Sequence, residues 1–342
     1  MSTSLDLNTI WYGLVGILFT GYAILDGFDL GTGALHLLTK KDEHRRTMMN
    51  AIGPVWNGNE VWLVTGGGAL FAAFPEVYAT VFSGFYQAFI LLLFALIFRA
   101  VAIEFRSKLA MPWWRSMWDV SFSVASIVVS LLMGVAFGNI VWGIPMNAGR
   151  EFTGTFFSLL NPFALLVGVT TVALFMMHGS IYVALKTEGE LHDQARVWIN
   201  NCIIFFIICY ATTTMATLLY LPHMSQHYRN NPVLFVVPLA TMLAIANIPR
   251  EIHRNRDFNA FLSSAAAMVG LMLLVAIGLF PYLVLARPDP ELGLSIYNAS
   301  SSPMTLKIML IIAVIGVPLV LAYTSSIYYI FRGKVRLDKM SY

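Results

Sequence analysis

The sequence predicts an all-α integral membrane protein that crosses the bilayer nine times, with its N-terminus outside and its C-terminus in the cytoplasm. Three observations predict this class: the composition, the length of the apolar segments and the distribution of basic residues among the loops. Of 342 residues, 58% are hydrophobic and 11% are charged, and the mean hydropathy is +0.72. Soluble domains carry about 25% charged residues. The composition therefore excludes a soluble enzyme, a disordered tail protein and a nucleic-acid binder.

Apolar segments of membrane-spanning length cover most of the chain. A helix needs about 20 largely apolar residues to cross the hydrocarbon core. Nine segments meet this requirement: roughly 9–33, 50–74, 78–103, 117–142, 160–185, 198–221, 232–249, 259–285 and 306–331. The first lacks the basic start and cleavage site of a signal peptide, so we interpret it as a mature span. Short loops leave no room for a soluble domain, and residues 1–342 are expected to form one polytopic membrane domain.

Basic residues alternate between the loops in step with these nine segments. Seventeen of the 21 Lys and Arg residues fall in loops on one side, and four (Arg150, Arg229, Arg287 and Lys307) fall on the other. Loops on the cytoplasmic side are enriched in Lys and Arg. The alternation predicts both the number of spans and their orientation.

A short internal repeat indicates how the spans are grouped. Residues 14–16 and 166–168 both read Leu-Val-Gly, and the same offset aligns His178-Gly179 with Asp26-Gly27. The repeat is compatible with two related four-helix halves, approximately residues 1–145 and 155–290, followed by a ninth helix at 306–331.

Ionisable and amide residues are concentrated in the cytoplasmic halves of the first five spans. Such residues are costly in an apolar helix and usually face a protein interior or water. They are Asp26, Asp29, Asn57, Asn59, Glu60, Arg99, Glu104, Asp119 and His178. The placement indicates a function that starts at the cytoplasmic side.

Two interpretations of these residues compete. The first is a hydrated relay that moves protons inward through Asp26, Asp29, Glu60 and His178. The second is an ion-pair network, with Arg99 bound to an aspartate, that only fixes helix packing. We favour the relay because Glu60 has no basic neighbour within its own helix.

For the residues near the membrane boundary, contact with water, ion pairing or helix packing is the simpler interpretation. Asp119 and Glu104 are expected to meet water there. Arg99 and Glu104 are candidates for ion pairing, and Trp56 flanks the polar stretch of the second span as a packing residue.

Histidines and cysteines argue against a cofactor held by this chain alone. A pair of stacked haems needs several histidines inside the spans, and His178 is the one that lies clearly inside. No Cys/His spacing typical of zinc or iron–sulfur sites occurs. Cys202 and Cys209 lie about 10 Å apart along one helix and cannot form a disulfide with each other.

Taken together and in order, the polar and glycine-rich motifs resemble those of a known family. The motifs are residues 26–31 (DGFDLG), 54–63 (PVWNGNEVWL), 67–75 (GGALFAAFP), 82–86 (FSGFY), 105–108 (FRSK), 134–139 (GVAFGN), 161–163 (NPF) and 189–192 (GELH). They resemble subunit II of the cytochrome bd quinol oxidases over essentially the whole chain, most strongly in residues 21–139.

The resemblance implies a heterodimer that oxidises quinol and reduces oxygen to water, with protons drawn from the cytoplasm. It places two haems b, one haem d and the quinol site in subunit I, so that this chain ligates no haem. It implies two four-helix bundles with a peripheral ninth helix, and a multi-pass location in a bacterial or archaeal cytoplasmic membrane. Subunit I, quinol, oxygen and membrane lipid are the implied partners. A small single-span third subunit is left open.

The second span departs from the family pattern. Many members have an acid after its tryptophan, where this chain has Asn57, and glutamine where this chain has Glu60. We hypothesise that the protonatable group has moved from position 57 to Glu60. Asp26 and Asp29 match the family motif directly and are expected to belong to the proton route.

Two other classes of protein remain as alternatives. A secondary transporter would couple the inner-half carboxylates to solute movement, but its paired broken helices have no clear counterpart in the second half of this chain. A purely structural subunit would use the acids only to pair with Arg99 and with a partner.

Overall fold

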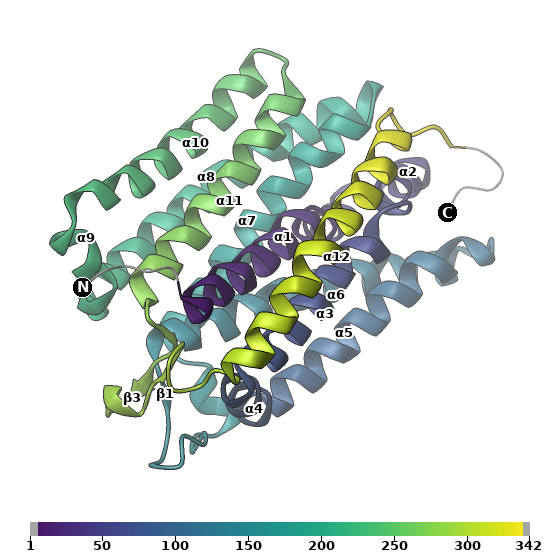
Figure 1. The fold of residues 1–342 in the computed structure, drawn as a ribbon. Helices are drawn as coiled ribbons and strands as arrows, with labels where there is room; N and C mark the ends of the chain where they lie inside the picture. Colours follow the sequence, from purple (N-terminus) through teal and green to yellow (C-terminus); the bar gives the residue numbers. More distant parts are fainter. Residues whose placement is uncertain (1–5, 338–342) are drawn as a thin grey trace.

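The structure, a computed structural model, describes residues 6–337 and is almost entirely helical (Figure 1). The helices are α1 (Leu7–Leu35), α2 (Asp42–Ile52), α3 (Trp56–Ala73), α4 (Pro75–Gly84), α5 (Tyr86–Phe105), α6 (Pro112–Trp142), α7 (Pro162–Lys186), α8 (Gly189–Tyr220), α9 (Gln226–Asn230), α10 (Val236–His253), α11 (Asp257–Leu279) and α12 (Pro303–Ile330). The short strands are β1 (Ile144–Pro145), β2 (Tyr282–Val284), β3 (Ala286–Arg287) and β4 (Leu294–Ser295).

Within the described residues, eight helices are long and apolar enough to cross a membrane. Each of them overlaps one of the nine predicted spans. The remaining one, 50–74, corresponds to the end of α2, a turn and the 18-residue helix α3, which begins with the polar sequence WNGNE. The turn contains Pro54, which lacks a backbone N–H to continue a helix.

Several predicted boundaries differ from the structure for identifiable reasons. The predicted span 78–103 is divided between α4 and α5, with a break at Phe85. Helix α8 starts nine residues before the predicted span 198–221, in a polar segment outside the apolar run. Helix α11 ends at Leu279, so the segment 280–285 belongs to a loop and to β2.

Capping residues and prolines begin several of the long helices. Asp6 accepts a hydrogen bond from the backbone N–H of Thr9 at 2.7 Å at the start of α1. Asn161 does the same for Ala164 at 2.9 Å, just before Pro162 at the first turn of α7. A side-chain oxygen at this position satisfies a backbone donor that the helix leaves unpaired.

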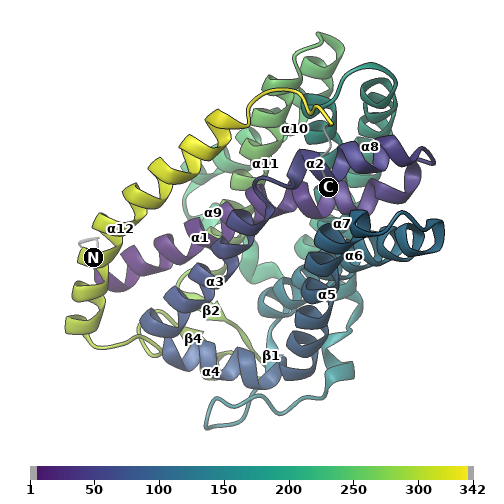
Figure 2. The same cartoon turned by 90° about the vertical axis from the view of Figure 1, so that its right-hand side faces the viewer.

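Helix α1 lies near the middle of the molecule and packs against helices from both halves of the chain. It contacts α3 and α6 from the first half and α7 and α11 from the second half. Helix α5 packs on α6, while α8 packs on α7 and α10 packs on α11. Helix α12 runs obliquely along the outside, next to α1 and α3, and most of its side chains are exposed (Figures 1 and 2).

The closest helix crossing joins α1 to α7 through glycine. A Cβ atom on Gly179 would lie 2.4 Å from the carbonyl carbon of Gly31, and a Cβ on Gly31 would lie 1.8 Å from the backbone oxygen of Phe175. Small residues permit such backbone approach in membrane helices.

Two small sheets tie together the loops at the end of the molecule where α12 begins. Strand β1 pairs in parallel with β3, and β2 pairs antiparallel with β4. The loop after α6 is thereby joined to the loop after α11. Elsewhere in the described chain, Cys202 and Cys209 on α8 are buried and free, as their spacing predicts.

Candidate functional site

The predicted carboxylates of α1 and α3 meet around one arginine of α5. Arg99 donates from Nη2 to Asp26 Oδ1 at 2.5 Å and from Nη1 to Asp26 Oδ2 at 3.1 Å. The same Nη1 donates to Glu60 Oε1 at 2.8 Å, and Nη2 lies 3.9 Å from Asp29 Oδ2. We call Asp26, Asp29, Glu60 and Arg99 the Arg99 cluster.

Two neutral residues extend this cluster to the peripheral helix. Asn59 on α3 donates from Nδ2 to Asp29 Oδ2 at 2.8 Å and to the backbone oxygen of Leu25 at 3.1 Å. The hydroxyl of Tyr328 on α12 donates to Asn59 Oδ1 at 2.8 Å. A hydrogen-bonded chain therefore connects α12 through α3 to the buried acid of α1.

The Arg99 cluster contains three acids and one base, and most of it is sealed from solvent. Asp26, Asp29 and Arg99 have no exposed side-chain surface, whereas 23% of the Glu60 side chain is exposed. Burial of uncompensated charge is costly. Arg99 neutralises one acid, so proton binding on the other two lowers the cost of burying the group.

Two buried oxygens next to Arg99 lack protein partners among the described residues. They are Oδ1 of Asp29 and the hydroxyl of Tyr22, one helical turn before Asp26 on α1. Buried polar atoms of this kind commonly bind ordered water. These two oxygens are therefore available to hydrogen-bond water.

The two candidate positions on α3 have different surroundings. Glu60 reaches Arg99, while Asn57 is exposed and Trp56 packs partly buried beside the core residues around Phe28. The absence of a basic residue within the helix of Glu60 does not keep this acid from forming an ion pair. Its basic partner comes from α5, a neighbouring helix that periodicity within α3 cannot reveal.

His178 on α7 lies apart from the Arg99 cluster. Its Nδ1 is 2.6 Å from Ser264 Oγ and its Nε2 is 3.0 Å from the backbone oxygen of Ile24. The ring stacks on Phe261, with centroids 4.7 Å apart. Both ring nitrogens are occupied by protein atoms, so this histidine does not present an open ligand to a haem iron.

A second ionic cluster lies beside the C-terminal ends of α1 and α5, between α2 and the start of α6. Asp119 accepts hydrogen bonds from Arg106 Nε at 2.5 Å and from Arg45 Nη1 at 2.9 Å, and its Oδ1 lies 2.6 Å from Nε2 of His36. The expectation that water reaches Asp119 was wrong, because its side chain is 2% exposed. Two arginines and His36 take the place of the solvent. Glu104, the other residue expected there, is half-buried on α5.

Sequence reasoning missed several members of these two clusters. Tyr22 and Tyr328 resemble ordinary aromatic residues of membrane helices, and Asn59 was recognised as polar without an assigned role. Arg106 was attributed to membrane topology, and His36, at the end of α1, was assigned no role. An adjacent carboxylate on another helix is the feature that distinguishes them, and it becomes visible only in three dimensions.

Across residues 6–337, no group of three or more His, Cys, Asp or Glu side chains is arranged to hold a metal ion. The three acids of the Arg99 cluster face a guanidinium rather than one another.

Comparison with known proteins identifies the family. The family model for cytochrome bd terminal oxidase subunit II matches residues 7–331. The chain belongs to this family, which makes it a subunit of a terminal respiratory oxidase. This assignment confirms the resemblance seen in the motifs and does not favour a secondary transporter.

Individual relatives cover nearly the whole chain. It is 36% identical to subunit 2 of cytochrome bd-I ubiquinol oxidase from Escherichia coli, over 96% of this chain and 95% of that one. It is 33% identical to cytochrome bd ubiquinol oxidase subunit 2 from Bacillus subtilis, over 96% and 97%. These bacterial relatives and the apolar helices indicate a multi-pass protein of the bacterial inner membrane, and they give no support to an archaeal source.

A solved structure has the same fold. A chain of the bd oxidase from Geobacillus thermodenitrificans superposes with a TM-score of 0.77, at 17% identity, over 95% of this chain and 98% of that chain.

Proposed function

We propose that this chain is the subunit of a quinol:oxygen oxidoreductase that ligates no haem, stabilises the haem-bearing subunit I and conducts protons from the cytoplasm. The observation that carries the proposal is the bonding of Glu60 and Asp26 to one nitrogen of Arg99. Glu60 is partly exposed and Asp26 is fully buried. Protons enter at Glu60 and pass inward to Asp26 and Asp29.

The transfer steps follow from the shared guanidinium. Glu60 Oε1 and Asp26 Oδ2 are both within hydrogen-bond distance of Arg99 Nη1, so one water molecule can bridge the two carboxyl groups. Arg99 keeps its proton and lowers the cost of each carboxylate left behind. Asp29 is the next acceptor, and Asn59 orients it with a hydrogen bond at 2.8 Å.

Glu60 takes the place of the acid that many relatives carry at position 57. Its contact with Arg99 supports this exchange, because a carboxylate at Glu60 joins the cluster directly. Asn57 contributes at most a polar group at the exposed entrance of the route. The two ring nitrogens of His178 are hydrogen-bonded to Ser264 and to the backbone of Ile24. His178 serves as a packing residue or as a branch of the proton route.

The surface around α3 supports a partner subunit. Asn57 and part of Glu60 are exposed on a helix that also presents exposed Val61, Val64 and Phe71. Lipid is a poor cover for an amide and a carboxylate. Subunit I supplies the cover in this proposal, together with two haems b, haem d and the quinol site. A small single-span subunit is a further candidate partner.

The proposal also includes the finer topology. The chain crosses the membrane nine times and has its N-terminus outside. Eight of the spans are the long apolar helices, and the short, polar helix α3 is the remaining one, second along the chain. The helices α1, α3, α5 and α6 form one four-helix bundle, α7, α8, α10 and α11 form the second, and α12 is peripheral. The packing of α5 on α6 and of α10 on α11 supports this grouping.

The first test is purification through a tag on this chain in mild detergent, followed by a reduced-minus-oxidised visible spectrum. Bands of haem b and haem d with a larger co-purifying subunit are the expected result. A stable and colourless single chain from cells that make haem d contradicts the proposal.

The second test separates a proton route from a scaffold. Glu60→Gln keeps the shape of the side chain and removes the titratable group. We expect an assembled complex with normal haem spectra and a quinol oxidase turnover at least tenfold lower. Asn57→Asp in the Glu60→Gln background is expected to restore part of the turnover. Unchanged proton uptake and turnover in Glu60→Gln would rule out the route through this residue.

A further inference from the structure

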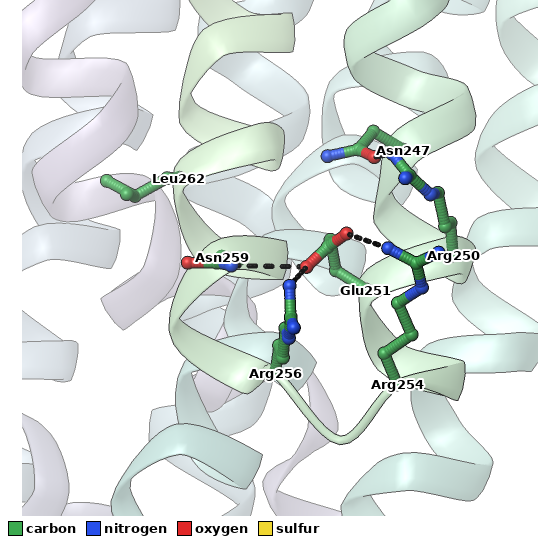
Figure 3. A pocket seen from close by; sticks show the side chains of 7 residues that line it. All are labelled: Asn247, Arg250, Glu251, Arg254, Arg256, Asn259 and Leu262. Carbon is green, nitrogen blue, oxygen red and sulfur yellow. Dashed lines mark hydrogen bonds and ion pairs between the residues drawn. The ribbon is translucent and has the colours of Figure 1, made fainter.

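Helices α10 and α11 line a basic cavity that is open to the outside of the molecule. The cavity measures about 380 Å³ (Figure 3). It is lined by Asn247, Arg250, Glu251, Arg254, Arg256, Asn259 and Leu262. Three arginines and one glutamate give its walls an excess of two positive charges.

Glu251 leaves much of this positive charge uncompensated. Its side chain is buried and accepts a hydrogen bond from Asn259 at 3.1 Å. The guanidinium nitrogens of Arg254 and Arg256 lie 3.9 and 4.0 Å from its oxygens, beyond the length of a direct hydrogen bond. Both arginines are about half exposed, so their donors can turn to another acceptor (Figure 3).

The cavity continues into an apolar groove between the same two helices. The groove measures about 600 Å³. It is lined by Leu243, Ala244, Ala246, Asn247, Arg250, Leu262, Ser263 and Ala266, and it shares Asn247, Arg250 and Leu262 with the basic cavity. Towards the middle of the membrane its walls carry only small and apolar side chains apart from Ser263.

Asn247 fixes the boundary between the basic and the apolar part. Its Nδ2 donates to Ser263 Oγ at 2.9 Å, and its Oδ1 accepts from Arg250 Nη1 at 3.1 Å. Arg250 is thereby oriented at the point where the two parts meet.

We propose that this site binds an anionic phospholipid, with its phosphate among Arg250, Arg254 and Arg256 and one acyl chain in the groove between α10 and α11. Arginine pairs well with phosphate oxygens, and basic pockets between membrane helices on the cytoplasmic side bind lipid head groups. A neutral quinone has no charge to match the three arginines. A free phosphate ion does not fill the apolar groove.

The site is tested on the purified complex by native mass spectrometry after delipidation. Phosphatidylglycerol and phosphatidylcholine with identical acyl chains are added separately, and bound lipid is counted at each concentration. We expect phosphatidylglycerol to bind the wild-type complex more tightly. Arg250→Gln, Arg254→Gln and Arg256→Gln are each expected to weaken its binding about fivefold, with little effect on phosphatidylcholine.

Ala266→Phe tests the acyl groove without changing charge, and it is expected to weaken binding of both lipids. Matched controls are Arg332→Gln, in the exposed segment after α12, and Ala322→Phe on the exposed surface of α12; both should bind lipid as the wild type does. Haem spectra show which variants assemble. Lipid binding is then compared for each assembled variant separately.

Three results overturn the proposal. One is equal binding of the two lipids by the wild-type complex. Another is an unchanged lipid preference in all three arginine variants. The third is displacement of phosphatidylglycerol by inorganic phosphate together with normal binding in Ala266→Phe, which indicates an ion site instead.

Discussion

Arg99 on α5 holds both carboxylate oxygens of Asp26 on α1, at 2.5 and 3.1 Å, and neither side chain has any exposed surface. This bidentate contact joins two helices through residues that lie 73 positions apart in the sequence. It places the positive charge of the cluster at a fixed point. The other two acids, Glu60 and Asp29, are positioned relative to that charge.

Asp26→Asn is expected to destabilise the assembled complex. Breaking a buried pair by removing one partner costs about 3–5 kcal/mol, because the remaining charge loses its compensation. Glu60 still contacts Arg99, so the loss should fall near the lower end of that range. The measurement is the temperature at which the purified complex loses its haem spectrum.

The control for this substitution is Glu190→Gln. Glu190 pairs with Lys41 on the surface, where both side chains are more than half exposed. Exposed pairs contribute little to stability, so this variant should melt with the wild type. Identical melting temperatures for the Asp26 and Glu190 variants would show that the buried pair is not a major stabilising contact.

The acids of α1 show how far the sequence alone can lead. An ionisable residue in an apolar helix is recognisable without any structure, and Asp26 and Asp29 were identified in this way. Their pairing with Arg99 was one of the alternatives. The simultaneous contact of Arg99 with Glu60 could not be predicted, since it depends on how α5 is rotated against α1 and α3.

The fold shows a similar division. Hydropathy located the long helices because the bilayer sets their length. It did not locate α4 or the break at Phe85, because a break inside an apolar run leaves the average hydropathy unchanged. It missed α2 and the break at Pro54, because α2 is a short polar helix that hydropathy does not detect. The burial of Asp119 was also unpredictable, since its three partners come from three separate segments.

Asp119→Asn should impair assembly more than Asp42→Asn does. Asp119 is buried and contacts Arg45, Arg106 and His36, so its loss leaves two closely spaced guanidinium groups without their shared anion. Asp42 pairs with Arg106 and Arg115, but its side chain is 48% exposed and water can replace it. The yield of haem-containing complex per cell measures the difference. Equal yields from the two variants would contradict the structural role of Asp119.

Gly179→Ala is expected to prevent close packing of α1 on α7. The added Cβ would lie 2.4 Å from the carbonyl carbon of Gly31, and two helix backbones cannot yield as a flexible side chain does. We expect a large loss of assembled complex in detergent. Gly316→Ala on α12 is the control, because its Cβ meets no atom within 4 Å. If the two variants assemble equally well, the tight crossing is not required.

His178→Asn should leave the haem spectrum of the assembled complex unchanged. Both ring nitrogens of His178 are taken by Ser264 and the backbone of Ile24, so the residue has no free nitrogen for iron. The smaller side chain leaves a cavity beside Phe261 and disrupts two buried hydrogen bonds, so a moderate fall in melting temperature is expected. Visible and magnetic circular dichroism spectra of the reduced complex provide the measurement. Loss of one haem signal at full assembly would mean that His178 ligates iron, whereas a normal spectrum with lowered stability agrees with a packing role between α7, α1 and α11.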